Sequence, residues 1–211
     1  MNADDFSIFE NKLFQQKGEE AQRKSLVLLK NEEQILPLQK GVKLFVEGID
    51  KTVVEQFANL VTTPSEADYI ILKTTTPYDP RSTYLLERFF HQGRLHFTEA
   101  EQSKYLKLLQ TKPTITVMNL ERPAIIPEIN AASKALIADF DCSDAIIMEL
   151  IFGKFQPSGK MPFELPSSVE AVEQQKEDVP YDSKNPLYPF GAGMQGFTQP
   201  SKELIGGVHS K

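Results

Sequence analysis

The chain has 211 residues, of which 40% are hydrophobic and 25% are charged, and this balance is typical of a globular protein with a proper apolar core. Its formal net charge of −6 argues against nucleic acid as a partner, because neutralising a phosphate backbone requires clustered Lys and Arg. Cys142 is the only cysteine, which excludes an intrachain disulfide, and no apolar run approaches the roughly 20 residues that a membrane span needs.

The first predicted element is a long helix over residues 9–31. Phe14, Ala21 and Leu28 fall roughly on one helical face, and Asn31 is a residue type at which helices end. Gly18 is the position at which such a helix would break. The strongly apolar stretch before Asn31 is expected to be the last turn of this helix.

Short apolar runs then alternate with helical stretches along the chain. Strands are expected at residues 42–46, 69–72, 115–118 and 135–140, and helices at residues 53–60, 83–90, 99–109, 127–132 and 145–152. Strands that alternate with helices are typical of βαβ units. The pattern therefore predicts an α/β fold, a three-layer sandwich with a mainly parallel sheet flanked by helices.

The C-terminal part of the chain is unusually rich in Pro, Gly and aromatic residues. Residues 153–166 read GKFQPSGKMPFELP and residues 186–193 read PLYPFGAG. Disordered segments are poor in aromatic residues, so this composition predicts an extended tail that packs against the body. The expected divisions of the chain are a linker helix region over residues 1–24, the sandwich over 25–166, and a polar loop with the returning tail over 167–211.

The loops after the predicted strands are the expected place for a ligand, because open parallel sheets bind ligands beyond the carboxyl ends of their strands. The carboxylates on or near these loops are the plausible chemical groups, since burial can raise the pKa of a carboxyl group so that it acts as a general acid. They are Asp79, Glu87, Glu121, Asp141 and Asp144. Together with Tyr78 and Arg81 they predict a polar rim of the kind that sugars prefer.

Other kinds of chemistry are not indicated. No glycine-rich phosphate loop follows the first expected strand, which disfavours nucleotide binding. His91, His96 and His209 form no metal-binding spacing with Cys142, so these histidines are expected to be satisfied or surface residues and Cys142 a small buried residue. We predict no metal and no organic cofactor.

Three separated stretches resemble one family. Residues 25–38 (SLVLLKNEEQILPL), 152–166 (FGKFQPSGKMPFELP) and 187–197 (LYPFGAGMQGF) are similar, in order and rough spacing, to motifs in the C-terminal domain of glycoside hydrolase family 3. The resemblance covers about residues 20–197. It implies the C-terminal domain of a β-glucosidase-like enzyme, in which Tyr78, Arg81 and Asp144 contact the sugar on one wall of the active site.

The resemblance also implies a mechanism and a missing partner. Family members hydrolyse β-glucosides, β-xylosides and N-acetyl-β-glucosaminides with retention, which requires two carboxyl groups beside the scissile bond. Their nucleophile is an Asp on an N-terminal (β/α)8 barrel, and nothing in this sequence resembles that barrel. The barrel and a carbohydrate substrate are therefore the expected partners, and a homodimer is a further possibility. The isolated chain is expected to be inactive.

The acid/base residue departs from the family pattern. Many members carry G-E-x-P-Y-x-E after the strand that begins A-D, and here Pro77 and Tyr78 match while Thr75 and Pro80 replace the two glutamates. Asp79 or Glu87 could take the role, or the barrel could supply both groups. After the fourth strand, the family's G-x-E-x-G is replaced by the stretch from Cys142 to Ile146.

Two other readings remain. A stand-alone carbohydrate-binding or scaffolding module would also lack the catalytic glutamate and the barrel. A receiver-like signalling domain shares the alternating pattern but lacks a paired acidic cluster after the first strand and leaves the tail unexplained. The N-terminus is acidic and has no signal-peptide pattern, so a cytoplasmic location is expected if Met1 is the natural start.

Overall fold

The computed structural model describes residues 12–81 and 90–198 of the chain. Its elements in chain order are α2 (Lys12–Ser25), β1 (Val27–Asn31), β2 (Lys43–Glu47), α3 (Lys51–Val54), β3 (Asn59–Leu60), β4 (Tyr69–Thr75), α4 (Glu99–Leu109), β5 (Thr114–Asn119), α5 (Pro127–Ala132), β6 (Ala135–Asp139), α6 (Asp144–Ile151) and α7 (Val169–Glu173), with 3₁₀ turns at Glu32–Gln34 and Pro64–Glu66. Within these ranges, no helix combines the length and the apolar character needed to cross a membrane.

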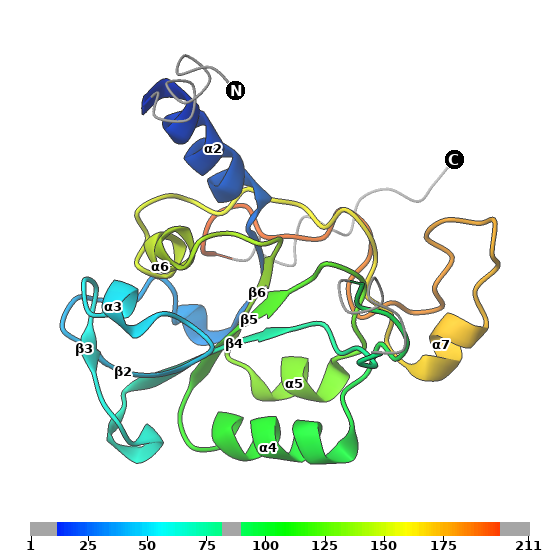
Figure 1. The fold of residues 1–211 in the computed structure, drawn as a ribbon, viewed down its shortest axis with the longest axis horizontal. Helices are drawn as coiled ribbons and strands as arrows, with labels where there is room; N and C mark the ends of the chain where they lie inside the picture. The colour runs from blue at the N-terminus through cyan, green and yellow to red at the C-terminus, as the bar shows by residue number, and fades with distance from the viewer. Residues whose placement is uncertain (1–11, 82–89, 199–211) are drawn as a thin grey trace, which may run out of the picture.

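A six-stranded sheet in the order β1-β6-β5-β4-β2-β3 forms the middle layer. The neighbouring strands from β6 to β3 pair in parallel, and β1 pairs antiparallel with β6. Helices α3 and α6 cover one face and α4 and α5 cover the other (Figure 1). The three-layer α/β sandwich with a mainly parallel sheet is therefore confirmed.

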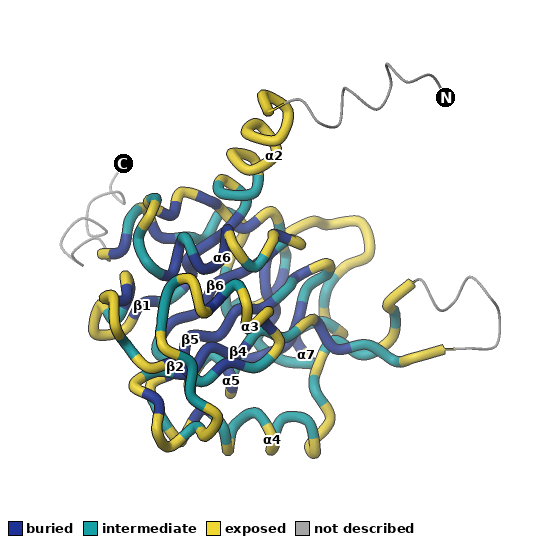
Figure 2. Tube along the Cα trace, turned by 60° about the vertical axis from the view of Figure 1, so that its left-hand side comes forward, coloured by how far each residue is buried: buried dark blue, intermediate teal, exposed yellow. Residues whose placement is uncertain are grey.

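The alternation of side chains along the central strands builds two separate cores. Ile115 and Val117 of β5 join the core beneath α3 and α6, whereas Met118 joins the core above α4 and α5. Both faces of the sheet are covered, so the strands read as nearly continuous apolar runs, as parallel strands do. Figure 2 shows these strands as the buried centre of the molecule, in contrast to the exposed helix α2.

The long N-terminal helix expected over residues 9–31 is wrong at its C-terminal end. Helix α2 ends at Ser25, without a break at Gly18, and the apolar stretch that follows is strand β1. Val27 and Leu28 of this strand are both fully buried, but they belong to the cores on opposite faces of the sheet. A helix with one apolar face cannot bury consecutive residues in this way, and pairing with β6 makes the strand the better solution.

The remaining differences are local. The helix expected over residues 53–60 ends at Val54, and the chain then turns into the short parallel edge strand β3. The polar loop expected at the start of the region 167–211 contains α7. Helices α4 and α5 have the predicted bounds, and α6 is displaced by one residue. The helix expected over 83–90 lies, except for Phe90, outside the described residues.

The Pro/Gly-rich tail lies along strand β1. Met194 donates its backbone N–H to the carbonyl oxygen of Leu28 at 2.8 Å, and Met161 donates to that of Ala192 at 2.8 Å. The buried Asn31 side chain donates to the backbone carbonyl of Phe197 at 2.8 Å. The tail therefore shields the outer edge of β1, where an exposed strand edge would be a site for aggregation.

Candidate functional site

A polar wall stands at the carboxyl ends of β4 and β5. It consists of residues 76–81 and 90–97 from the β4–α4 connection and residues 119–126 from the β5–α5 connection. Thr76 joins the two connections, because its buried hydroxyl donates to the carbonyl oxygens of Asn119 and Arg122 at 3.1 and 3.0 Å. A threonine directly after β4 thus fixes where the chain leaves the sheet.

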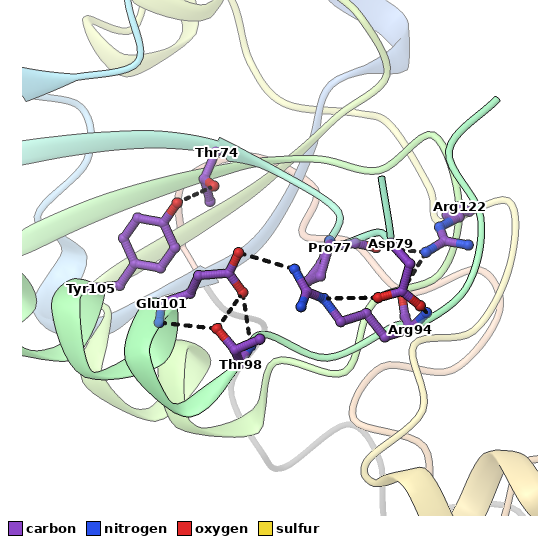
Figure 3. A network of polar contacts seen from close by, with 8 residues as sticks. All are labelled: Thr74, Pro77, Asp79, Arg94, Thr98, Glu101, Tyr105 and Arg122. Carbon is purple, nitrogen blue, oxygen red and sulfur yellow. Dashed lines mark hydrogen bonds and ion pairs between the residues drawn. The ribbon is translucent and has the colours of Figure 1, made fainter. Parts of the chain in front are cut away.

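Arg122 connects the two parts of the wall through hydrogen bonds. Its Nη2 donates to the backbone carbonyl of Pro77 at 2.6 Å and also to that of Arg94. Pro77 is the second residue after β4 and Arg94 lies near the start of α4, so one guanidinium bridges both ends of the β4–α4 connection (Figure 3). The planar fork of arginine suits two carbonyl acceptors at once.

Asp79 links the two ends of the β4–α4 connection. Its Oδ2 accepts the Arg94 backbone N–H at 2.9 Å, its Oδ1 lies 3.8 Å from the Arg94 Nε, and its own backbone N–H donates to Gln92 at 2.8 Å. Gly93 makes room for the carboxylate, since its φ is +82° and an added Cβ would lie 2.0 Å from Oδ2. The Asp79 carboxylate is therefore occupied with holding the loop.

The same network continues into helix α4. Arg94 Nη2 donates to Glu101 Oε1 at 3.0 Å, and Glu101 forms a capping box with Thr98 at the start of the helix (Figure 3). The capping box fixes the start of the helix locally, and the contact between Arg94 and Glu101 attaches the described end of the β4–α4 connection to that helix. The wall is thus attached to β4, β5 and α4.

His91, Tyr78 and Glu121 meet on the exposed surface of the wall. The rings of Tyr78 and His91 stack with centroids 3.7 Å apart and an interplanar angle of 15°. Glu121 Oε1 contacts His91 Nδ1, and the two side chains are 43% and 33% exposed. Tyr78 and Glu121 were both among the residues singled out from the sequence, but His91 was not, because nothing in the spacing links it to Glu121.

The other predicted site residues lie apart from this group. Arg81 is exposed at the end of the first described segment, and Glu87 lies outside the described residues. Asp144 belongs to a second cluster, in which its Oδ1 accepts from Lys73 Nζ at 2.6 Å and its Oδ2 accepts from the backbone N–H of Asp50 at 2.7 Å. Asp144 therefore joins α6 to β4 and to the start of α3.

Beneath this second cluster lies a buried carboxylate, Asp139, at the end of β6. Its side chain is fully buried, its Oδ1 accepts the backbone N–H of Cys142 at 2.8 Å, and its Oδ2, 3.9 Å from Lys73 Nζ, has no hydrogen-bond partner among the described residues. Burial raises the pKa of the Asp139 carboxyl above its ordinary value. Burial also raises the pKa of the Cys142 thiol, and the expectation that Cys142 is a small buried residue is confirmed.

Asp139 is expected to make the folding free energy depend on pH. A carboxyl whose pKa is raised in the folded state binds more protons folded than unfolded, so the free energy of unfolding falls as pH rises from the unfolded pKa through the raised one. Asp139→Asn keeps an acceptor for Cys142 and cannot ionise. Chemical denaturation at several pH values should therefore show the wild type losing stability relative to this variant as pH rises above about 4, the ordinary pKa of an Asp carboxyl. The total loss should be about 1.4 kcal/mol for each unit by which the folded pKa exceeds the unfolded one.

The control for this experiment is Asp178→Asn, which also removes one negative charge but at an exposed position. A difference between wild type and Asp139→Asn that stays constant with pH would contradict the prediction. A wild type that gains stability relative to Asp139→Asn at neutral pH would show that the contact with Lys73 outweighs burial.

A cavity of about 280 Å³ borders the wall on its other side. Leu95 and Pro123 of the wall line it together with Phe163 and Tyr181 of the tail. Tyr181 stacks on Phe190 with centroids 4.3 Å apart, and both rings are 53% exposed. Within the described ranges, no three His, Cys, Asp or Glu side chains are placed to hold one metal ion.

Known proteins with similar sequences are glycosidases. The sequence model of the Glycosyl hydrolase family 3 C-terminal domain matches residues 42–196. The chain is 42% identical to the probable beta-glucosidase C of Aspergillus flavus, over 87% of this chain and 30% of that protein. It is 35% identical to the periplasmic beta-glucosidase/beta-xylosidase of Dickeya chrysanthemi, over 86% of this chain and 28% of that protein. The chain thus spans about 30% of the length of these curated relatives.

Solved structures share the fold at low sequence identity. The beta-glucosidase from Listeria innocua in complex with glucose matches with a TM-score of 0.65 and 18% identity, over 88% of this chain and 34% of that chain. A beta-glucosidase from Chaetomella raphigera matches with a TM-score of 0.69 and 15% identity, over 90% of this chain and 37% of that chain. In both cases the match covers about a third of a much longer chain.

Proposed function

The chain belongs to glycosyl hydrolase family 3, whose C-terminal domain it matches, and on that premise we propose that it forms one wall of the sugar-binding active site of a β-glucosidase-like enzyme. The family resemblance read from the three sequence stretches is confirmed. The observation that carries the proposal is the wall at the carboxyl ends of β4 and β5, where an aromatic ring, cations and carboxylates share one exposed edge.

The residues of the wall suit the binding of a pyranose. Tyr78 offers an apolar ring for the face of a sugar, and the exposed guanidinium of Arg81 offers donors for its hydroxyls. Asp79 has a different role in this proposal, because its carboxylate is held by Arg94 and closes the loop. Asp144 likewise acts at a distance by fixing the start of α6 through Lys73.

The hydrolysis itself needs a second part of the enzyme. Retention of configuration requires a carboxylate nucleophile and an acid/base group on opposite sides of the scissile bond. In this proposal the nucleophile lies on an N-terminal barrel domain that belongs to the other two thirds of the enzyme's length. The chain described here contributes the wall that closes over the sugar.

The test compares the isolated 211-residue chain with the longer protein that contains it. The longer protein is expected to hydrolyse 4-nitrophenyl β-glucoside and to release β-glucose first, as followed by proton NMR, whereas the isolated chain is expected to show no turnover. The 4-nitrophenyl α-glucoside serves as the control substrate.

Three outcomes would count against the proposal. No glycosidase activity in the longer protein would remove the function, and release of α-glucose first would remove the retaining mechanism. A native protein with a mass of 23.8 kDa that binds glucose without hydrolysing glucosides would favour a stand-alone carbohydrate-binding module.

A further inference from the structure

The His91 imidazole has the surroundings of a proton-transfer group. Glu121 Oε1 contacts its Nδ1, and the ring of Tyr78 stacks on its face. Its Nε2 has no hydrogen-bond partner among the residues that the structure describes. An imidazole with a carboxylate at one nitrogen has its orientation and its tautomer set, so the other nitrogen is free to give or take a proton.

His91 is also held in place although it is partly exposed. The next residue along the chain, Gln92, accepts the Asp79 backbone N–H at 2.8 Å, and Arg94 is clamped by both Asp79 and Arg122. Glu121 directly precedes Arg122 and follows the buried Leu120. The two partners are thus fixed to β4 and β5 through backbone contacts, as a catalytic pair requires.

The other candidates for proton transfer on the wall are less well placed. The Asp79 carboxylate accepts a hydrogen bond from the Arg94 backbone N–H and lies beside the Arg94 guanidinium. The loop would lose these contacts if the carboxylate turned away. Thr75 carries a hydroxyl, which is a poor proton donor near neutral pH. The His91–Glu121 pair is therefore the described group on the wall in which a carboxylate holds an imidazole that solvent can reach.

We infer that His91, oriented by Glu121, is the general acid/base of the hydrolysis, an inference that rests on the proposed function. In the first step His91, as an imidazolium with its Nδ1–H toward Glu121, gives its Nε2 proton to the glycosidic oxygen while the bond from that oxygen to C1 breaks, and C1 bonds to the carboxylate nucleophile of the remaining enzyme. The neutral imidazole that is left keeps its proton on Nδ1. In the second step Nε2 takes a proton from water while the water oxygen bonds to C1 and the carboxylate leaves. His91 ends in its starting protonation state.

The test uses the full-length enzyme and two leaving groups. Phenyl β-glucoside needs protonation to leave, whereas 2,4-dinitrophenyl β-glucoside does not. His91→Gln is expected to lower kcat/KM for phenyl β-glucoside by at least about 100-fold, and that for the dinitrophenyl substrate by less than about 10-fold, because general acid catalysis contributes roughly 10²–10⁴. Azide should restore turnover of the dinitrophenyl substrate and yield β-glucosyl azide.

Glu121→Gln tests the positioning role, and Glu173→Gln, at an exposed position of α7 outside the wall, is the matched control. Glu121→Gln is expected to lower kcat/KM for phenyl β-glucoside by about 10-fold and to affect the dinitrophenyl substrate less. If Glu121 had a purely structural role, the variant would lower kcat/KM for both substrates equally. Glu173→Gln should leave kcat/KM for both substrates within about 2-fold of the wild type. Thermal unfolding of each variant confirms that it folds, and Glu121→Gln decides the question if His91→Gln does not fold.

The outcomes separate this inference from the proposed function. Equal losses for both substrates, or a change in KM alone, would make His91 a binding residue and overturn the inference while the proposed function stands. A wild-type enzyme that hydrolyses neither glucoside would overturn both.

Discussion

Gly159→Ala is expected to lower the free energy of unfolding by about 3 kcal/mol, since overpacking a tight contact costs about 1–3 kcal/mol or more. A Cβ on Gly159 would lie 2.3 Å from the carbonyl oxygen of Leu26 and 3.0 Å from that of Lys24. Both contacts are backbone atoms, in the last turn of α2 and directly before β1, so a side-chain rotation cannot relieve them. The tail would have to move off the edge of the sheet.

Thermal unfolding followed by circular dichroism measures the effect. For a chain of this size the expected loss corresponds to a fall in Tm of about 6–12 °C. Gly18→Ala is the matched control, because Gly18 lies in helix α2 with nothing within 4 Å of an added Cβ. That change is expected to raise stability by about 0.5–1 kcal/mol. A Gly159→Ala protein as stable as the wild type would contradict the close packing of tail and β1.

Arg122→Lys is expected to lower kcat/KM of the full-length enzyme for 4-nitrophenyl β-glucoside by about 100-fold. The arginine fork holds the carbonyl oxygens of Pro77 and Arg94 at once, and a lysine ammonium presents a point charge on a flexible stem. Release of either carbonyl would let Tyr78 and His91 shift, and a displacement of about 1 Å in an active site can cost about 10²-fold in rate.

Steady-state kinetics with the purified full-length variant test this expectation. Lys107→Met on the exposed side of α4 is the control for loss of a cation and should change kcat/KM by less than about 2-fold. Activity of Arg122→Lys within about 3-fold of the wild type would mean that the wall is organised without this bridge.

Much of the fold could be predicted from local sequence. Helix α4 has the predicted bounds, and its start is set locally, because Thr98 and Glu101 form a capping box whose hydrogen bonds lie within four consecutive residues. Strands β4 and β5 were recognised from the short apolar runs YIIL and ITVM, because strands buried on both faces are nearly continuous apolar runs. The family motifs in the tail were recognised as well, since they are continuous in sequence.

Contacts between residues that are far apart in the sequence could not be predicted from local patterns. The apolar run in β1 is compatible with a helix or a strand by composition, and its pairing with β6, more than 100 residues later, decided for the strand. Among the candidate site residues, Asp79 was one of two candidates for the acid/base, and its contact with Arg94, 15 residues later, could not be predicted from local sequence. His91 and Glu121 are 30 residues apart, and no periodicity joins them.

The amino-acid sequence by itself determined the α/β class, most of the strands and helices, and membership of the family, because each of these depends on residues that are neighbours along the chain or on continuous motifs. The tertiary structure alone decided that β1 is a strand, that the tail lies on its edge, and which side chains meet on the wall. Those features depend on contacts between residues that are far apart in the sequence. Such contacts form only when the whole chain is packed.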